Sequence, residues 1–395
     1  MKILKKSFFF FSLFSFIFAL SSCQLKSKKS NSNEEKTTKT NNSNEVQEGK
    51  TEEKVPTISL ENSVVTNTLF FDKNGKESKT TAIPVLKNLK TEIEKLVTDI
   101  DTKNLVLNFK YNPFHSKIFI LVGDSSQFNI FQPYQKIFIS DLDGTNLKMV
   151  YTLSQTDQNS ANYLAGFTFS ADGKTEAGWI EQDRSIEEYP TRIKIVNLEE
   201  LIKDTKSVSF NQFELPPDFA FFNNFLAIQT DILIFKSDKI VGEKYGDSLL
   251  NYSSRSSNSL RVKPFLFIED AIKFLNISNS EVSIGTLFSS NKKTGKENII
   301  YSIIATSQTG STMFLVEQSE VAKIKVVKSF KDTNFSCESQ VAIREKIPCV
   351  QLSFDSKIKT GSLVQFDLST GKILEITKSK NLSELGNNPI WWEIN

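Results

Sequence analysis

From Val55 onward, the chain alternates apolar and polar residues in short runs that are separated by turn-forming residues. This alternation has the two-residue period of β-strands that bury one face. The run from Val64 to Asp72, for example, leads into Asn74-Gly75, a pair typical of the tight turn in a β-hairpin. The pattern predicts one all-β domain over residues 55–395.

One segment departs from the alternation and predicts a helix over about residues 85–100. Its apolar residues recur at the spacing of one helix face, and Pro84 stands just before them. These apolar residues are Leu86, Leu89, Ile93, Leu96, Val97 and Ile100. We expect this single short amphipathic helix to pack one face onto the β domain.

The strand pattern repeats along the chain. Phe109–Gly123 (FKYNPFHSKIFILVG) and Phe167–Glu181 (FTFSADGKTEAGWIE) each consist of an aromatic strand, a polar turn and a second apolar strand. Further members are a third strand after each of these (Lys136–Gly144 and Arg192–Glu200), a late copy (Val350–Phe354, Ser362–Gly371 and Lys372–Thr377) and weaker copies (Phe219–Lys236, Phe265–Phe288 and Ile299–Val327). A repeat of about 50 residues with four short strands is typical of a β-propeller.

Two segments carry a resemblance to a known family. FSADGK at Phe169–Lys174 and ISDLDGTNLKMV at Ile139–Val150 resemble the blade motifs of TolB-type, WD40-like propeller repeats. In those repeats, an Asp-Gly turn joins the first two strands, and a D-x-D-G segment turns the third strand into the fourth. The chain departs from the pattern at Pro113-Phe114-His115 and in the blades between about Ser207 and Phe330. The resemblance implies a role in the cell envelope.

The repeat length leaves two blade counts open. Residues Asn104–Asn395 divide into six blades, and into seven if Leu60–Lys79 supplies strands; we favour seven. The segment Asn388–Ile394, with Trp391 and Trp392, resembles the first strand of a further blade, which in propellers pairs with N-terminal strands to close the ring. We therefore expect the two tryptophans to be closure residues rather than a ligand platform.

The first 22 residues have the pattern of an export signal. Lys2, Lys5 and Lys6 precede an apolar run, Ser7–Leu20, that is dominated by Phe. This run is shorter than the ~20 apolar residues that a spanning helix needs.

The end of this leader resembles the lipobox of bacterial lipoproteins. Leu20-Ser21-Ser22-Cys23 implies cleavage before Cys23 and acylation, including palmitate, of that residue, and the leader is also similar to those of spirochaete lipoproteins. The alternative is an ordinary secretory leader with an incidental cysteine, which still exports the protein.

Residues 23–54 predict a disordered tether. Gln24–Lys54 contains almost only Lys, Glu, Asn, Ser and Thr, a composition that cannot offset the entropy cost of folding. We therefore expect a protein of the cell envelope that is lipid-anchored at Cys23, with the outer membrane and its periplasmic or surface face left open.

Composition limits the chemistry that is available to the domain. The formal net charge is +2, so we expect no nucleic-acid partner. His115 is the single histidine, which disfavours a Ser-His-Asp triad and an imidazole zinc site. Catalysis by a pair of carboxylates remains open, because it needs no histidine.

The two remaining cysteines, Cys337 and Cys349, are close in sequence. In an exported protein such a pair predicts a local disulfide, whose chain-entropy contribution is ~3 kcal/mol. The alternative is two reduced cysteines on neighbouring strands.

Few motifs point to a site. Asp141-Leu142-Asp143-Gly144 with Asn146 has the alternating oxygens of a calcium loop but lacks its closing Glu, so we expect an ordinary turn. His115 is expected to be a surface turn residue. Glu187–Pro190 and Ser253–Ser259, with Arg255 and Arg261, predict long loops of the kind where partners dock.

These observations lead to three classes of function. We expect a membrane-anchored, non-catalytic and monomeric module whose propeller face binds a protein partner, in envelope assembly or host-component binding. This reading predicts no enzyme, cofactor, catalytic residue or metal. The alternatives are a propeller-type hydrolase that uses acidic residues or a metal at the ring centre, and a structural envelope lipoprotein.

Overall fold

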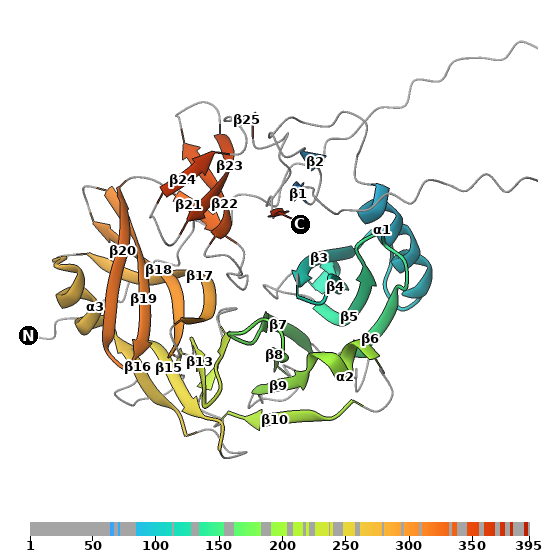
Figure 1. Cartoon of the computed structure of the whole chain (residues 1–395), viewed down its shortest axis with the longest axis horizontal. Helices are drawn as coiled ribbons and strands as arrows, with labels where there is room; N and C mark the ends of the chain where they lie inside the picture. The colour runs from blue at the N-terminus through green and yellow to red at the C-terminus, as the bar shows by residue number, and fades with distance from the viewer. Residues whose placement is uncertain are drawn as a thin grey trace, which may run out of the picture. The chain divides into compact units, whose positions relative to one another are not determined.

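The computed structural model of the 395-residue chain consists mainly of antiparallel β-sheets (Figure 1). It describes residues 64–66, 70–71 and 84–393, except for 113, 128–133, 154–161, 183–190, 204–207, 216–218, 221–225, 237, 240–247, 257–260, 279, 294–295, 308–309, 332–333, 338–345, 355–358, 368–371, 376–379 and 382–390. The predicted all-β class is confirmed. The leader, Cys23, the tether, Asn74-Gly75 and Glu187–Pro190 lie outside the described residues.

The first large sheet contains eight strands in two antiparallel groups of four. They are β3 (Leu105–Asn112), β4 (Lys117–Asp124), β5 (Tyr134–Asp141), β6 (Lys148–Thr152), β7 (Tyr163–Phe169), β8 (Glu176–Gln182), β9 (Thr191–Asn197) and β10 (Phe210–Glu214), with the 3-10 turn η2 (Ser125–Gln127) after β4. A single residue pair, Tyr134 with Leu164, joins the two groups.

Three further sheets follow in chain order, and a short pair, β11 (Phe219–Ala220) with β14 (Asp238–Lys239), lies outside them. They comprise β12 (Leu226–Ile228), β13 (Ile232–Phe235), β15 (Ser248–Ser254) and β16 (Lys263–Phe267); β17 (Glu281–Lys293), β18 (Lys296–Ser307), β19 (Gly310–Glu320) and β20 (Lys323–Lys331); and β21 (Asn334–Cys337), β22 (Lys346–Phe354), β23 (Lys359–Asp367), β24 (Lys372–Glu375) and β25 (Lys380–Asn381). The late sequence repeat thus begins one strand earlier, at β21, than the pattern predicted.

The two ends of the described chain meet in one small sheet. Strand β1 (Val64–Thr66) pairs with β2 (Phe70–Phe71) on one side and with β26 (Trp391–Glu393) on the other. Trp391 lies opposite Thr66, and Trp392 lies opposite Val65. The strand that carries the tryptophans therefore pairs with an N-terminal strand, as expected from its resemblance to an incomplete blade.

Helix α1 (Pro84–Leu96) lies where the sequence predicted a helix. Pro84 occupies its first position, where a missing amide hydrogen costs no helical bond. Leu89 and Ile93 are fully buried against β3–β5. Leu96 is 58% exposed, so the prediction that it belongs to the buried face of the helix is wrong. The helix ends at Leu96, and the following residues turn Val97 and Ile100 back into the core.

Two helices were not predicted, so the expectation of a single helix is wrong. They are α2 (Leu198–Lys203) and α3 (Ile268–Leu275). Helix α3 buries Ala271 and Leu275, carries two acidic residues in its first turn and ends at Asn276 in the left-handed conformation, a common helix C-cap. The helical signal was short, and apolar strand-like residues surrounded it on both sides.

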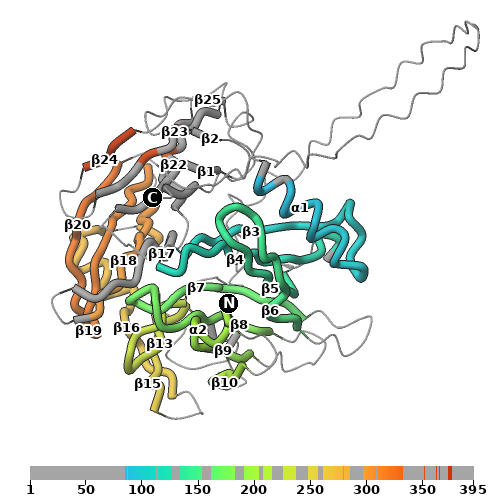
Figure 2. The backbone as a smooth tube through the Cα atoms, turned by 45° about the vertical axis from the view of Figure 1, so that its right-hand side comes forward, coloured from blue at the N-terminus to red at the C-terminus, as the bar shows by residue number. Residues whose placement is uncertain are grey.

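Neighbouring strand groups pack face to face through alternate residues of single strands. On β4, Ile118 and Ile120 join the core beneath α1, whereas Phe119 and Leu121 join a second core with Phe167 and Trp179 from β7 and β8. Figure 2 shows α1 and the β7–β9 strands on opposite sides of β3–β5. This stacking brings the turn between the first two strands of one group toward the corresponding turn of the next group.

Candidate functional site

The first turns of consecutive strand groups contact one another directly. The Asn112 side-chain amide, at the end of β3, donates to the Gly173 carbonyl at 2.9 Å, and Asn112 is fully buried. The Ala171 backbone amide donates to the Ile228 carbonyl at 3.0 Å, and Ser170 and Ile228 form a parallel bridge. The turns after β3, β7 and β12 therefore form one continuous polar edge.

Asp172 organises the middle turn of this edge. Its carboxylate accepts hydrogen bonds from Ser170 Oγ (2.7 Å), from the backbone amides of Lys174 (2.9 Å) and Thr175 (3.0 Å), and from Thr175 Oγ1. Burial alone would raise the pKa of Asp172, but these hydrogen bonds outweigh it and lower the pKa to about 2. Ser170 Oγ in turn accepts from the Glu176 amide at 3.0 Å, which fixes the residue at which β8 begins.

Glu176 forms a two-pronged ion pair with Arg255, which lies at the end of β15. Arg255 Nη1 donates to Glu176 Oε2 at 2.9 Å, and Nη2 donates to Oε1 at 2.7 Å. Both side chains are mostly buried, with exposed fractions of 15% and 19%. Nη1 also donates to the carbonyl of Gln229 at 2.9 Å, so Arg255 joins the turns after β7 and β12.

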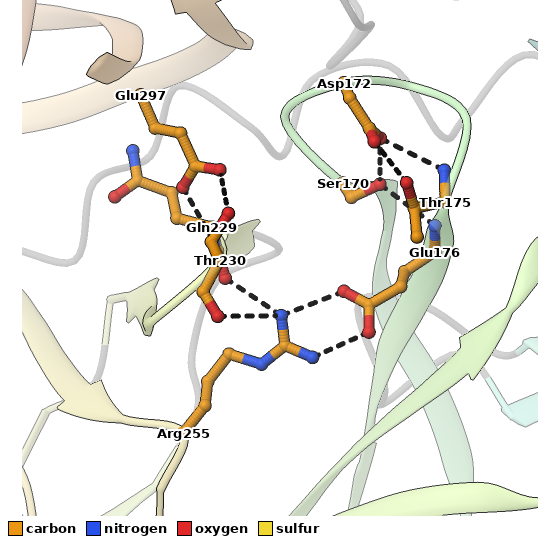
Figure 3. Close-up of polar contacts among 8 residues, drawn as sticks. All are labelled: Ser170, Asp172, Thr175, Glu176, Gln229, Thr230, Arg255 and Glu297. Carbon is orange, nitrogen blue, oxygen red and sulfur yellow. Dashed lines mark hydrogen bonds and ion pairs between the residues drawn. The ribbon is translucent and has the colours of Figure 1, made fainter. Parts of the chain in front are cut away.

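The third turn is tied to the next sheet by Glu297, near the start of β18. The Thr230 backbone amide donates to Glu297 Oε2 at 2.6 Å, and Thr230 Oγ1 donates to Oε1. Thr230 is exposed and Glu297 is partly exposed, so this end of the arrangement faces solvent. Figure 3 shows the resulting set, which we call the turn cluster: Ser170, Asp172, Thr175, Glu176, Gln229, Thr230, Arg255 and Glu297.

The turn cluster unites three carboxylates with one guanidinium and one buried amide. Each oxygen of Glu176 accepts one hydrogen bond from Arg255, and a carboxylate oxygen can accept a second. The Glu297 carboxylate accepts only from the neutral groups of Thr230 among the hydrogen bonds of the described residues. Among the described residues, the cluster thus holds one carboxylate paired with a cation, Glu176, and two that accept hydrogen bonds from neutral donors, Asp172 and Glu297.

A second polar group is buried between the strand groups. Glu181, with a side chain 6% exposed, contacts Lys194 Nζ at 3.2 Å and accepts from Trp179 Nε1 at 2.9 Å and from Tyr151. Burial first, and the Glu181 charge second, raise the pKa of the Tyr151 hydroxyl. This group lies in the core with Trp179 and is not part of the turn cluster.

The residues that the sequence singled out lie in different parts of the structure. Arg255, singled out only as part of a loop, is a central member of the turn cluster. His115 contacts the Lys174 carbonyl at 2.8 Å through Nε2, so it joins two neighbouring turns. Asp141 accepts from Asn146 and Lys117, and Asp143 accepts from Thr145, so both acids of the calcium-like segment bond within or beside their own turn.

Of the three cysteines, Cys337 and Cys349 are among the described residues and Cys23 is not. Cys337 and Cys349 are direct register partners on antiparallel strands β21 and β22. Both sequence readings of this pair, a disulfide and two reduced cysteines on neighbouring strands, place it on adjacent strands.

Sequence reasoning missed most of the turn cluster. Asp172 belongs to the quoted FSADGK motif, but Glu176, Gln229 and Glu297 follow no motif. Aligning the sequence repeats would have matched the turns between the first and second strands of successive groups. Glu176, Gln229 and Glu297 all lie at or next to such a turn.

No family model and no curated protein matches the chain. Among solved structures, the chain is similar to the GH93 α-L-arabinofuranosidase of Fusarium graminearum, with a TM-score of 0.35 and 10% identity over 73% of this chain and 96% of that chain. It is also similar to an endo-arabinase from Bacteroides thetaiotaomicron (TM-score 0.32, 8% identity, 65% and 92% covered) and to the WD40 domain of SCAP from fission yeast (0.28, 9%, 70% and 87%). We carry no substrate or residue role over from these neighbours.

These neighbours contradict two predictions. Several of them are glycoside hydrolases, whereas the sequence predicted a non-catalytic interaction module and no enzyme; we withdraw both predictions. Both predictions depended on the scarcity of histidine and of known catalytic motifs. However, the turn cluster gathers carboxylates from separate sheets, a set that no local motif displays.

Proposed function

We propose that the described sheets are six blades of one β-propeller. Their first strands begin at Leu105, Tyr163, Leu226, Glu281, Asn334 and Trp391, at intervals of roughly 57 residues. Under this proposal, β26, β1 and β2 form the sixth blade, in which the two ends of the chain pair and close the ring. The N-terminal strands then complete this blade rather than adding the seventh that we had favoured.

We propose that the protein is a hydrolase of glycosidic bonds that uses the carboxylates of the turn cluster. One observation supports this function above the others: Glu176 and Glu297, from different sheets, are bridged by Arg255 and Thr230 at a partly exposed edge. Two positioned acids suffice for this reaction, because one protonates the leaving oxygen and the other activates water or attacks the sugar carbon.

The contacts of the two acids suggest their roles. Glu176 is paired with the Arg255 cation, so we assign it as the nucleophile or base. Glu297 has no cationic partner among the described residues, so its carboxyl is the better candidate of the two to carry a proton, and we assign it as the proton donor to the leaving-group oxygen. The carbon–oxygen bond breaks, the leaving group departs as an alcohol, and water supplies the new hydroxyl and restores the proton.

The test is hydrolysis of neutral polysaccharides, whose alcohol leaving groups need a proton, by the full chain purified in detergent micelles. Glu176→Gln and Glu297→Gln should each lower kcat by at least about 100-fold, in the range expected for loss of a general acid or base. Glu199→Gln, which changes an exposed carboxylate on α2, should leave kcat unchanged. Equal activity of all three variants, with thermal melting curves that show them folded, would exclude the proposed roles.

Chemical rescue separates the two roles. Azide should restore part of the activity of a Glu176→Ala variant, because a small anion can replace a missing nucleophile or base. A substrate with a good leaving group should restore activity to Glu297→Gln, because such a group needs no proton. The reverse pattern would exchange the two assignments.

We also propose that the protein is held at the cell envelope through lipid on Cys23, as the lipobox-like segment implies. Among the helices of the described residues, none has the length and apolarity to cross a membrane. Labelling of cells with a palmitate analogue should modify the wild type and a Cys337→Ala variant equally. Cys23→Ala should carry no label, and persistent labelling of that variant would refute the anchor.

A further inference from the structure

Gln229 is a buried residue of the turn cluster whose side-chain amide nitrogen has no acceptor. The residue is 5% exposed, and Nε2 is among the buried polar atoms that lack a hydrogen-bond partner. A buried donor without an acceptor opposes folding, and in native proteins such a group needs an explanation.

The backbone of Gln229 is held firmly between the two acids. Its amide donates to the Ile232 carbonyl at 3.0 Å, and its own carbonyl accepts from Arg255, the partner of Glu176. The next residue, Thr230, binds Glu297. In the view of Figure 3, the Gln229 side chain extends away from the Glu176–Arg255 pair.

We propose that Gln229 Nε2 is a specificity-determining donor that binds a hydroxyl or ring oxygen of a glycan sugar next to Glu297. This inference rests on the proposed function, since it assigns a ligand to the same site. A sugar hydroxyl or ring oxygen is a suitable acceptor for this amide donor. The free protein therefore keeps the donor unpaired, and bound sugar supplies its acceptor.

The protein offers a matched control in a second buried glutamine. Gln318 is also fully buried, but its Nε2 donates to the carbonyls of Phe265 at 3.1 Å and of Glu320 at 3.0 Å. Replacing Gln318 with Met removes satisfied hydrogen bonds, whereas the same replacement at Gln229 removes a donor that has none. Only the substitution at Gln318 should therefore lower the melting temperature.

The experiment compares Gln229→Met and Gln318→Met in the full chain. Gln229→Met should keep or raise the melting temperature without sugar, and Gln318→Met should lower it. L-Arabinose, D-xylose, D-glucose and their β-linked disaccharides serve as probes: at least one should raise the melting temperature of the wild type, and that shift should be lost in Gln229→Met.

A deoxy series then tests the contact itself. Removal of one hydroxyl from the best probe should weaken wild-type binding at least about tenfold, the effect of one lost hydrogen bond. In Gln229→Met, the same deoxy analogue should bind as well as the parent sugar.

The outcomes separate this inference from the proposed function. A fall in melting temperature of Gln229→Met to the level of Gln318→Met, a sugar shift that survives in Gln229→Met, or no shift with any probe would overturn the inference while leaving hydrolysis open to its own test. A Gln229-dependent sugar shift without hydrolysis of any glycoside would support the inference and refute the hydrolase.

Discussion

Lys194 and Glu181 illustrate how single residues place charge inside this β structure. Their side chains are 18% and 6% exposed, and Lys194 Nζ also donates to the Tyr151 hydroxyl at 2.7 Å. The Glu181 carboxylate is thus stabilised by one cation and by two neutral donors, Trp179 and Tyr151. Loss of the cation leaves a buried charge that only these donors stabilise.

We therefore expect Lys194→Met to lower the free energy of unfolding by about 3 kcal/mol. The control is Lys203→Met, which removes the partner of Glu199 in an exposed pair and should cost less than about 0.5 kcal/mol. Urea denaturation at neutral pH measures both. Equal effects of the two variants would show that the buried pair contributes no more than a surface pair.

Asp172 makes the stability of its turn depend on pH. Its pKa is lowered to about 2 in the folded protein from the ordinary 3.8. A carboxyl with a depressed folded-state pKa stabilises above the unfolded pKa, and this contribution disappears as pH falls through the folded value. Because Asp172 is exposed, solvent screening reduces the effect to about 1 kcal/mol.

Asp172→Asn should thus be about 1 kcal/mol less stable than the wild type above about pH 4. The difference should vanish between about pH 4 and pH 2, where the wild-type carboxyl becomes protonated. Chemical denaturation across this range measures the two curves. A constant difference at every pH would mean that the lost hydrogen-bond geometry, rather than the charge, is responsible.

At the scale of elements, Gly178 on β8 allows one strand group to pack on the next. A Cβ atom there would lie 2.5 Å from Ile228 Cδ1 of β12 and 2.9 Å from the Lys194 carbonyl of β9. Both distances are shorter than van der Waals contact. The small residue is therefore required by close approach of neighbouring elements.

Gly178→Ala should lower stability by about 1–3 kcal/mol, the usual cost of overpacking. Ile228→Val removes the closest atom, so the double variant should recover part of this loss, whereas Ile228→Val alone should destabilise slightly. Thermal unfolding of the three variants gives the coupling. Strictly additive effects would contradict a direct contact between the two positions.

Strands β21 and β22 bring Cys337 and Cys349 into register. The predicted disulfide would close this local loop and contribute about 3 kcal/mol. We expect both thiols to resist alkylation until a reductant is added, as measured by intact mass. Labelling of both cysteines without reductant would favour the reduced alternative.

At the scale of the whole molecule, the pairing of β1 with β26 joins the two ends of the domain. Removing residues 391–395 would leave the backbone of β1 paired only with β2. We expect this truncation to lower the melting temperature by more than about 5 °C, in line with a loss above 1 kcal/mol. Removing residues 24–54, the tether that the sequence predicts, should have no such effect, and equal melting of both truncations would argue against closure by β26.

The sequence pattern anticipated the elements better than the site. The strand pairs around residues 109–123 and 167–181 and the helix near residues 85–100 follow from apolar spacing, which is local. Helix α3 was missed because its eight residues lie among strand-like runs. Glu297 was missed because a single glutamate after a lysine-rich turn carries no local signal.

The sequence by itself determined the all-β class, the repeat of strand and turn, and the buried face of α1, because each depends on residue periodicity within a short window. Only the tertiary structure decided which turns meet. Arg255 reaches Glu176 across 79 positions, and Thr230 reaches Glu297 across 67. Such contacts depend on how successive sheets stack, so the proposed site exists only in the folded protein.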